Sequence, residues 1–306
     1  MSSVLKYINQ NPQEAQRLVG LKYESVKNLI AKTEELHEKK QVSLDSQKRR
    51  IIKKGGGRKP KLSVPEQILL TLVYLRHLPT FQLLGIQFGI SETTANDIFN
   101  YWFPLLRELL PASPIEQVKK NAEDYEMVKE MLTGFELIVD SCEQPRERPG
   151  DYEKQKEYYS GKTKNHTFKN QLIVMPLGKD IVDVLVGEVG KKSDINLWKE
   201  RAKEFAPQQK FQGDKAYVGY EAIKTPQKKS KKKQLGLEEK TQNKELAKNR
   251  IFVEHLIRLV KVWRIAQARF RLNTKKYEQI VLTICGLVRL RIKSLILSGQ
   301  KSTKLS

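Results

Sequence analysis

The stretch Phe135-Glu-Leu-Ile-Val-Asp140 is a short apolar run that ends in an acid. Two further runs of the same kind follow, 169–176 (KNQLIVMP) and 181–188 (IVDVLVGE), and the turn residues Gly178-Lys-Asp180 separate them. Runs of this length, rich in Val and Ile and bounded by turn residues, are typical of β-strands. We therefore expect three neighbouring strands in the middle of the chain.

After these runs the spacing of apolar residues changes from strand-like to mostly helical. A helix is expected from Asp194 to Phe205 with Ser193 or Asp194 as its cap, then a short strand over 209–214, and two long helices over about 243–269 and 276–296. Between them, 225–248 is rich in Lys and Gln and is expected to be a mobile basic insertion. Strands, helix, strand and then helices indicate a mixed α/β domain.

The chain before residue 134 has a helical pattern. Pro65 is placed for a helix start, and the segment 80–106 (TFQLLGIQFGISETTANDIFNYWFPLL) predicts a helix, a tight turn at Gly89 and a second helix capped by Ser91. Two short helices joined by a Gly turn are typical of a helix-turn-helix unit, although an ordinary helical hairpin fits this stretch equally well. In a helix-turn-helix unit the first turns of the second helix would face the DNA major groove; these residues are Thr93, Thr94, Asn96, Asp97 and Asn100.

A basic segment precedes this unit. Residues 48–61 (KRRIIKKGGGRKPK) carry eight basic residues, no acid and three consecutive glycines. Such a stretch cannot bury itself, so it is expected to be extended and suited to following phosphates, with a plain solvated linker as the alternative. The first 45 residues predict short amphipathic helices.

The charge of the chain narrows its partners. Of its 306 residues, 57 are Lys or Arg and 35 are Asp or Glu, which gives a formal net charge of +22. An excess of this size favours a polyanionic partner, with nucleic acid first. The longest apolar stretches, 67–75 and 280–288, are far shorter than the roughly 20 residues that span a bilayer. The start lacks a signal-peptide pattern, and two cysteines are too few for a disulfide framework or a zinc site. We therefore expect a cytoplasmic protein that acts on nucleic acid.

Three acids are placed where they could carry chemistry. Asp140 and Asp214 each end a predicted strand, where α/β sheets often place reactive groups. On position alone a turn-capping role is the commoner one for Asp140, and a turn role is about as common for Asp214. Glu254 lies on the first long helix, with Arg250 and Lys261 on the same face at offsets of four and seven. The alternative for this face is an ordinary surface ion pair. Carboxylates are the ligands that Mg²⁺ prefers, and two such ions can serve phosphoryl transfer.

At these positions the sequence resembles the DDE transposases of bacterial insertion sequences, in the insertion-sequence-five class that is also similar to Harbinger-like DDE endonucleases. The C-terminal signature of that class, Arg, three residues, Glu, six residues and Lys, is matched by Arg250, Glu254 and Lys261. The tyrosine that often precedes the Arg by three positions is replaced by Ala247. The segments 140–149 (DSCEQPRERP), 159–169 (YSGKTKNHTFK) and 213–219 (GDKAYVG) resemble the other catalytic blocks, and 57–62 with the helix-turn-helix stretch resembles the N-terminal region.

The resemblance implies a ribonuclease-H-like catalytic domain in which Asp140, Asp214 and Glu254 bind two Mg²⁺ ions, for which Mn²⁺ can substitute. It implies an enzyme that binds the ends of an insertion sequence, hydrolyses DNA strands and joins the 3′-hydroxyl ends to target DNA. Its partners would be double-stranded DNA and a second copy of the chain in a homodimer or larger oligomer, with no membrane and no small-molecule substrate, in the nucleoid region of the cytoplasm. The residues expected to contact DNA are Arg58, Lys59, Thr93, Thr94, Asn96, Lys162, Arg250 and Lys261.

The resulting domain prediction has five parts. They are a helical segment (1–47), a basic Gly-rich linker (48–61), a helix-turn-helix DNA-binding domain (62–133), a catalytic domain (134–296) with an insertion at about 225–248, and a tail (297–306). Two other functions stay open at this level. One is a transposase descendant that binds DNA but no longer cleaves it, and the other is a basic RNA-associated structural protein. The roles of His166 and Glu143 are also open.

Overall fold

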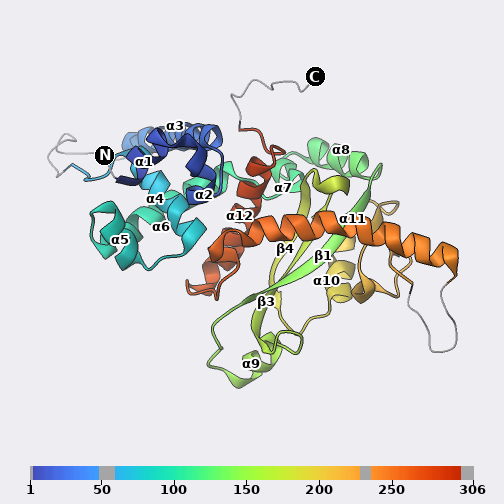
Figure 1. Ribbon diagram of the computed structural model, residues 1–306. Coiled ribbons are helices and arrows are strands. Elements are labelled where there is room, and N and C mark those ends of the chain that lie inside the picture. Colours follow the sequence, from blue (N-terminus) through green and yellow to red (C-terminus); the bar gives the residue numbers. More distant parts are fainter. Residues whose placement is uncertain (1–2, 48–58, 228–235, 298–306) are drawn as a thin grey trace. The chain divides into compact units, whose positions relative to one another are not determined.

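The chain folds into two compact units, which we describe separately. A computed structural model describes residues 3–47, 59–227 and 236–297. Unit 1 comprises 1–110 with the short segments 263–265 and 295–306, and unit 2 comprises 111–262 and 266–294. Most of the predicted basic segment, the centre of the predicted insertion and the tail after 297 lie outside the described residues (Figure 1). None of the helices in the described ranges is both long and apolar enough to cross a membrane.

Unit 1 is helical. Its helices are α1 (Ser3–Gln10), α2 (Ala15–Val19), α3 (Tyr23–Gln47), α4 (Val64–His77), α5 (Phe81–Phe88) and α6 (Glu92–Leu109). Helix α4 is apolar on nearly every side and packs against α2, α3, α5 and α6, so it forms the centre of the unit. It begins with a capping box, in which Glu66 accepts a hydrogen bond from the backbone N–H of Ser63 at 2.8 Å.

The predicted helix-turn-helix geometry is confirmed in α5 and α6. Helix α5 ends at Gly89, which has a φ of 68° and therefore occupies the left-handed region that favours glycine. Ser91 caps α6 by accepting a hydrogen bond from the backbone N–H of Thr94 at 3.2 Å. A side chain at Gly85 would lie 2.8 Å from the carbonyl oxygen of Ile90, so the two helices meet closely at the turn.

Unit 2 begins earlier than the sequence suggested. Helices α7 (Pro114–Val118) and α8 (Ala122–Leu132) fall in the predicted helix-turn-helix domain, yet they belong to unit 2. The reason is their apolar side chains, since Ile115 and Leu132 are buried in the same hydrophobic cluster as strand residues of the sheet. Helical periodicity identifies an apolar face but does not say which partner covers it.

A six-stranded mixed sheet forms the centre of unit 2. Its strands are β1 (Glu136–Pro145), β2 (Tyr159–Ser160), β3 (Asn165–Val174), β4 (Ile181–Val189), β5 (Lys210–Gln212) and β6 (Ile223–Lys224). The order is β2-β3-β1-β5-β6, with β4 also paired to β3. β3 pairs antiparallel with β1 and with β4, whereas β5 pairs parallel with β1 and with β6. The three predicted strands and the short one after them are therefore confirmed.

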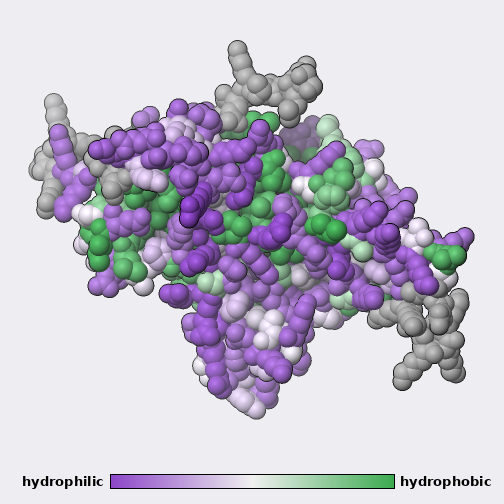
Figure 2. All heavy atoms as spheres, in the orientation of Figure 1, coloured by the Kyte–Doolittle hydropathy of each residue, from purple (hydrophilic) through white to green (hydrophobic). Residues whose placement is uncertain are grey.

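Helices cover both faces of this sheet. On one face, Leu137 and Val139 of β1 pack in a cluster with Trp198 of α10 (Asp194–Ala202). The alternate residues of β1 face α11 (Leu237–Lys261) and α12 (Tyr277–Arg291), as the hydrogen bond from the Tyr277 hydroxyl to Gln144 Oε1 shows. Beyond these layers, β1 and β3 continue toward α9 (Tyr152–Tyr158), where the visible surface is mostly polar (Figure 2). A mixed sheet with helices after an all-helical region confirms the expected ribonuclease-H-like fold class.

The long helix differs from its predicted bounds. Helix α11 starts at Leu237, inside the expected insertion, where Glu239 Oε2 accepts a hydrogen bond from the N–H of Gly236 at 2.8 Å. It ends at Lys261 rather than Arg269, and Trp263 after it is buried in unit 1. The apolar spacing continues past Lys261, so the pattern alone could not show where the helix stops.

Candidate active site and DNA-binding surface

Asp140 and Asp214 lie just past the point where β1 and β5 stop pairing. Asp214 follows the end of β5, whereas Asp140 lies within β1, which continues to Pro145, and so does not end a strand as the sequence predicted. β1 and β5 are parallel neighbours in which Ile138 pairs with Gln212. Each acid lies two residues beyond this pair, so both follow the carboxyl-terminal direction of adjacent strands. Open α/β sheets place ligands beyond the carboxyl ends of their strands. Asp140 accepts a hydrogen bond from the N–H of Ser141 at 2.8 Å, and Asp214 accepts one from the N–H of Ala216 at 2.7 Å.

Glu254 reaches the same region from helix α11. The helix is fixed on β5 by Gln212, which donates to the carbonyl oxygen of Leu246 at 2.8 Å and accepts from Asn249 at 3.2 Å. The next turn carries Arg250, whose Nε donates to Glu254 Oε1 at 2.9 Å. The predicted ion-pair face of this helix is therefore present. The pair is solvent-exposed, with half of the Glu254 side chain accessible, as an ordinary surface ion pair would be; the attachment of α11 to β5 is what the spacing alone left open.

The charges of Asp214 and Glu254 both act on Asp140. The pKa of Asp140 is raised to about 6, chiefly by burial and also by the charges of Asp214 and Glu254, while the Ser141 N–H and Arg250 oppose the rise. A carboxylate in this position is costly to ionise because it loses water and faces like charges. A cation between the carboxylates would lower the cost of ionising Asp140.

The acids therefore suit a hard divalent cation by their chemistry. In the described part of the chain, no three His, Cys, Asp or Glu side chains stand close enough together to hold a metal ion as they are. Carboxylates are nevertheless the oxygen donors that Mg²⁺ prefers, and a divalent ion would offset the repulsion felt by Asp140.

The two cations of the predicted signature lie on the same side of the sheet as Asp140. The charge of Arg250 acts on Asp140, and the charge of Lys261 acts on Cys142, two residues further along β1. Burial raises the pKa of the Cys142 thiol to about 11, so this cysteine stays protonated and takes no part in acid–base chemistry near neutral pH. Arg250 and Lys261 thus flank the acids with positive charge.

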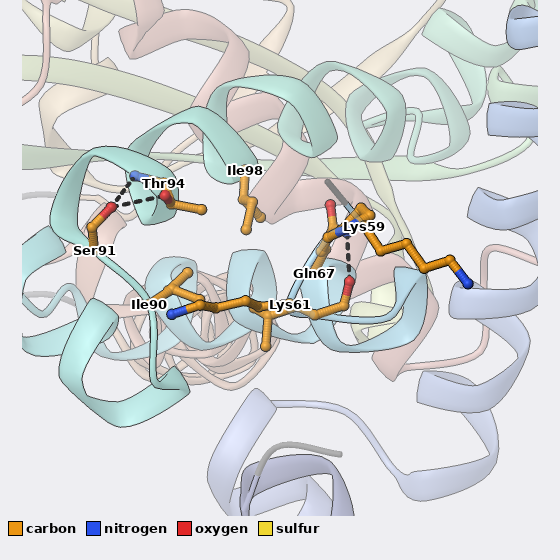
Figure 3. A pocket seen from close by; sticks show the side chains of 9 residues that line it. Lys59, Lys61, Gln67, Ile90, Ser91, Thr94 and Ile98 are labelled. Atoms are coloured by element: carbon orange, nitrogen blue, oxygen red, sulfur yellow. Dashed lines mark hydrogen bonds between the residues drawn. The ribbon is translucent and has the colours of Figure 1, made fainter. Parts of the chain in front are cut away.

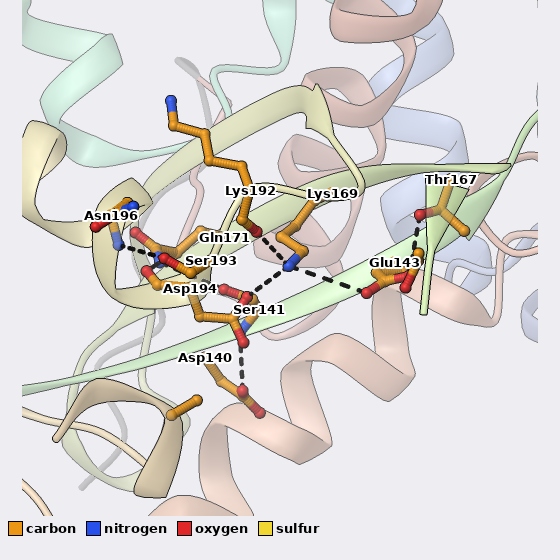
Figure 4. Close-up of polar contacts among 12 residues, drawn as sticks. Asp140, Ser141, Glu143, Thr167, Lys169, Gln171, Lys192, Ser193, Asp194 and Asn196 are labelled. Atoms are coloured by element: carbon orange, nitrogen blue, oxygen red, sulfur yellow. Dashed lines mark hydrogen bonds and ion pairs between the residues drawn. The ribbon is translucent and has the colours of Figure 1, made fainter. Parts of the chain in front are cut away.

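On the opposite side of β1, an ion network supports the strand (Figure 4). Lys169 is buried; its Nζ lies 3.1 Å from Asp194 Oδ1 and 4.0 Å from Glu143 Oε1, and it donates to the carbonyl oxygen of Lys192 at 2.6 Å. Glu143 also accepts hydrogen bonds from Thr163 at 3.1 Å and Thr167 at 2.9 Å. Glu143 therefore holds the turn that carries the exposed Lys162.

His166 lies apart from the acids. It is on β3 opposite Tyr159 of β2, and its ring contacts the Tyr159 ring edge-on at 5.7 Å between centroids. Partial burial lowers its pKa, and the charges of Arg148 and Arg146 add to the effect. His166 is thus a neutral strand residue near neutral pH, consistent with a structural role.

A second surface lies in unit 1, where the end of the basic segment meets helix α6 (Figure 3). A cavity of about 430 Å³ is lined by residues 59–62, Gln67 and the start of α6. Gln67 holds the segment by donating to the carbonyl oxygen of Leu62 at 2.9 Å, and Trp102 in turn donates to Gln67 at 2.8 Å. Residues 59–62 are therefore attached to the helical unit rather than forming a free linker, which places Lys59 beside α6.

The predicted recognition residues lie at the solvent side of α6. Thr93 and Thr94 are exposed and Asn96 is half-buried, in the first two turns of the helix. Thr94 also takes part in the cap through its hydroxyl, 2.8 Å from that of Ser91. Lys59 is exposed at the rim of the cavity, whereas Arg58 lies outside the described residues.

Comparison with known proteins identifies the family of this chain. Residues 139–289 match the family model described as DDE superfamily endonuclease, and residues 60–112 match the helix-turn-helix of DDE superfamily endonuclease. A probable transposase for insertion sequence element IS702 from Microchaete diplosiphon is 32% identical over 243 residues, which cover 77% of this chain and 83% of the relative. The chain belongs to the DDE transposases of insertion sequences. The resemblance of its motifs to this family is thereby confirmed.

Solved transposase structures are more distant from this member of the DDE family. The piggyBac transposase synaptic complex with hairpin DNA is 11% identical with a TM-score of 0.41, over 94% of this chain and 77% of that one. The Mos1 transposase paired-end complex is 11% identical with a TM-score of 0.21, over 84% of each chain. Scores this low carry no argument about the geometry of the site.

The sequence pattern did not indicate the buried polar side chains beside β1 and between β5 and α11. Tyr217 and Gln171 are fully buried polar residues beside β1, and Gln212 connects β5 to α11. A tyrosine three residues after Asp214 was visible in the motif, but nothing in the spacing showed what its hydroxyl meets.

Proposed function

We propose that this transposase cleaves DNA strands at the ends of an insertion sequence and joins the freed 3′-hydroxyl ends to target DNA, with Asp140, Asp214 and Glu254 as its catalytic carboxylates. The observation that carries the proposal is the register of β1 and β5. It brings two acids about 70 residues apart in sequence to the point where β1 and β5 stop pairing, where the charge of Glu254 also acts.

The three carboxylates would hold Mg²⁺ or Mn²⁺, most simply as a pair of ions. When bound, such ions supply activation of the attacking oxygen and stabilisation of the leaving oxygen in phosphoryl transfer. Asp140 and Asp214 would orient their oxygens through the backbone N–H groups of Ser141 and Ala216, which leave their other oxygens available. Arg250 would keep Glu254 in place and, with Lys261, attract the DNA backbone.

Unit 1 supports binding of double-stranded DNA. Thr93, Thr94 and Asn96 are placed to read base edges, whereas Lys59, and Arg58 before it, would contact phosphates. Lys162 would provide a further phosphate contact from the turn held by Glu143. Two element ends must be handled together, so we infer that the active species is a homodimer or a larger oligomer, acting on DNA in the bacterial cytoplasm.

The test is strand cleavage of a labelled duplex that carries the DNA flanking the gene. Wild type should cut at a defined end with Mg²⁺ or Mn²⁺ and not with EDTA. Asp140→Ala, Asp214→Ala and Glu254→Ala should each abolish cutting while leaving DNA binding largely intact. Glu130→Ala, which removes an exposed carboxylate on α8, is the matched control and should cut at the wild-type rate.

The outcomes separate the alternatives. A variant of one of the three acids that still cuts at the wild-type rate removes that residue from the site. Binding without metal-dependent cutting by wild type would instead indicate a transposase descendant that retains only DNA binding. Substituting Thr93 or Asn96 should change the preference among DNA sequences, while Lys59→Glu should weaken binding to all sequences alike.

A further inference from the structure

A buried polar network connects strand β1 to the turn after β5. The Tyr217 side chain is fully buried in the cluster on the α10 face, and its hydroxyl oxygen lies 2.9 Å from Ser141 Oγ. Gln171, the neighbour of Ser141 across β1 and β3, donates from Nε2 to the Tyr217 hydroxyl at 3.1 Å and to Ser141 Oγ at 3.3 Å. Figure 4 shows Gln171 and Ser141 together above β1 and Asp140 on the other side.

The orientation of the Gln171 amide follows from one backbone group. Gln171 Nε2 also lies 3.1 Å from the carbonyl oxygen of Asp194, which can only accept, so the amide nitrogen must point this way. Burial holds the pKa of Tyr217 well above its usual value, so its hydroxyl keeps its proton. Tyr217 and Ser141 share one hydroxyl–hydroxyl hydrogen bond, in which either oxygen can be the donor.

The network joins Ser141, which follows Asp140, to Tyr217, which lies three residues after Asp214. Ser141 follows Asp140 and bonds its carboxylate through the backbone N–H. Tyr217 closes the turn that starts at Asp214, with its N–H donating to the Asp214 carbonyl oxygen at 3.2 Å. A side chain at Gly213 would lie 2.9 Å from the Tyr217 ring, so the ring also fits tightly against the residue before Asp214. Ser141 is bonded to the Asp140 carboxylate and Tyr217 to the Asp214 carbonyl oxygen, so the hydroxyl contact between Ser141 and Tyr217 links the two acids.

We propose that Tyr217 is a positioning residue that, through Ser141 and Gln171, sets the spacing between the Asp140 and Asp214 carboxylates and thereby the affinity of the site for divalent ions. This inference rests on the proposed function. Tyr217 itself touches neither DNA nor ion in this role, because its hydroxyl is on the α10 side of the sheet and the acids are on the α11 side.

The experiment compares wild type with Tyr217→Phe in the full-length protein. Binding of Mn²⁺ without DNA is measured by electron paramagnetic resonance, and the Mn²⁺ concentration for half-maximal strand cleavage is measured separately. Phenylalanine keeps the ring in the core and removes only the hydroxyl. We expect Mn²⁺ affinity to fall by roughly 10- to 100-fold, the usual cost of losing a group that orients metal ligands.

The matched control is Tyr277→Phe. Tyr277 is also buried, and its hydroxyl donates to Gln144 Oε1 at 3.1 Å and accepts from Asn170 at 2.8 Å, but it stands next to neither acid in sequence. Its Mn²⁺ affinity should stay at the wild-type value. Ser141→Ala removes the other end of the contact without touching the core tyrosine, and it should reproduce the loss seen in Tyr217→Phe. The double variant should lose no more than either single variant.

Three results would overturn the inference. These are wild-type Mn²⁺ affinity in Tyr217→Phe, an equal loss in Tyr277→Phe, and additive losses in the double variant with Ser141→Ala. If Tyr217→Phe does not fold, Ser141→Ala alone decides by the same Mn²⁺ measurement. A wild-type protein that cuts DNA and binds Mn²⁺ while these variants match it defeats only this inference, whereas a wild type that does neither defeats the proposed function.

Discussion

Replacing Asp140 by asparagine should make the metal-free protein more stable while abolishing cleavage. Asparagine keeps the acceptor oxygen for the Ser141 N–H and removes the charge that faces Asp214 and Glu254. Burial, with these like charges, raises the pKa of Asp140 to about 6 from an ordinary value of 3.8. At about 1.4 kcal/mol per pH unit, the ionised carboxylate costs the folded state up to about 3 kcal/mol.

The upward shift of the Asp140 pKa sets the pH range in which the stability changes. Because the pKa of Asp140 is higher in the folded state, the folded protein binds more protons than the unfolded chain between about pH 4 and 6, and stability falls as pH rises through this range. Asp140→Asn lacks this titration. The stability difference between variant and wild type should therefore be near zero at pH 4, grow between pH 4 and 6, and stay constant above it.

The assay is urea unfolding followed by circular dichroism at pH 4, 5, 6 and 8 in EDTA. Asp97→Asn, the same chemical change at an exposed position of α6, is the control and should show no such pH-dependent gain. Adding Mg²⁺ at pH 8 should stabilise wild type and not Asp140→Asn. An Asp140→Asn protein that is equal to or less stable than wild type at pH 8 would refute the account of a strained, repelled carboxylate.

Three further predictions concern stability and binding. Arg289 is almost fully buried and donates to Asp180 at 2.7 and 2.9 Å. Arg289→Met should therefore lower the free energy of unfolding by about 3 to 5 kcal/mol. A loss below about 1 kcal/mol in urea unfolding would contradict a buried ion pair. Ser91→Ala removes the cap of α6 and should cost about 1 kcal/mol in the same assay, with an unchanged midpoint arguing against the cap. Raising salt from about 50 mM to about 200 mM should weaken DNA binding by roughly 10³-fold or more in a fluorescence anisotropy titration, and binding that ignores salt would remove the electrostatic basis of the proposal.

Local patterns were sufficient where a short segment determines its own structure. The strands around 135–140, 169–176 and 181–188, the turn at Gly89 and the Ser91 cap were all predicted, because apolar runs bounded by turn residues, glycine conformation and capping depend on neighbouring residues. The bounds of α11 and the unit to which α7 and α8 belong were not predicted. They depend on which distant apolar surface covers a helix, as Ile115 and Leu132 show.

For the candidate site, the sequence by itself determined which residue types are available: two acids that follow apolar strand-type runs, and one acid between two cations on a helix face. That β1 continues past Asp140 was decided by its pairing with β3. Only the tertiary structure decided that they meet, because the parallel register of β1 and β5 and the docking of α11 through Gln212 are contacts between distant segments. The same holds for the raised pKa of Asp140 and for the Tyr217 network, since burial and facing charge exist only once the sheet and helices have packed.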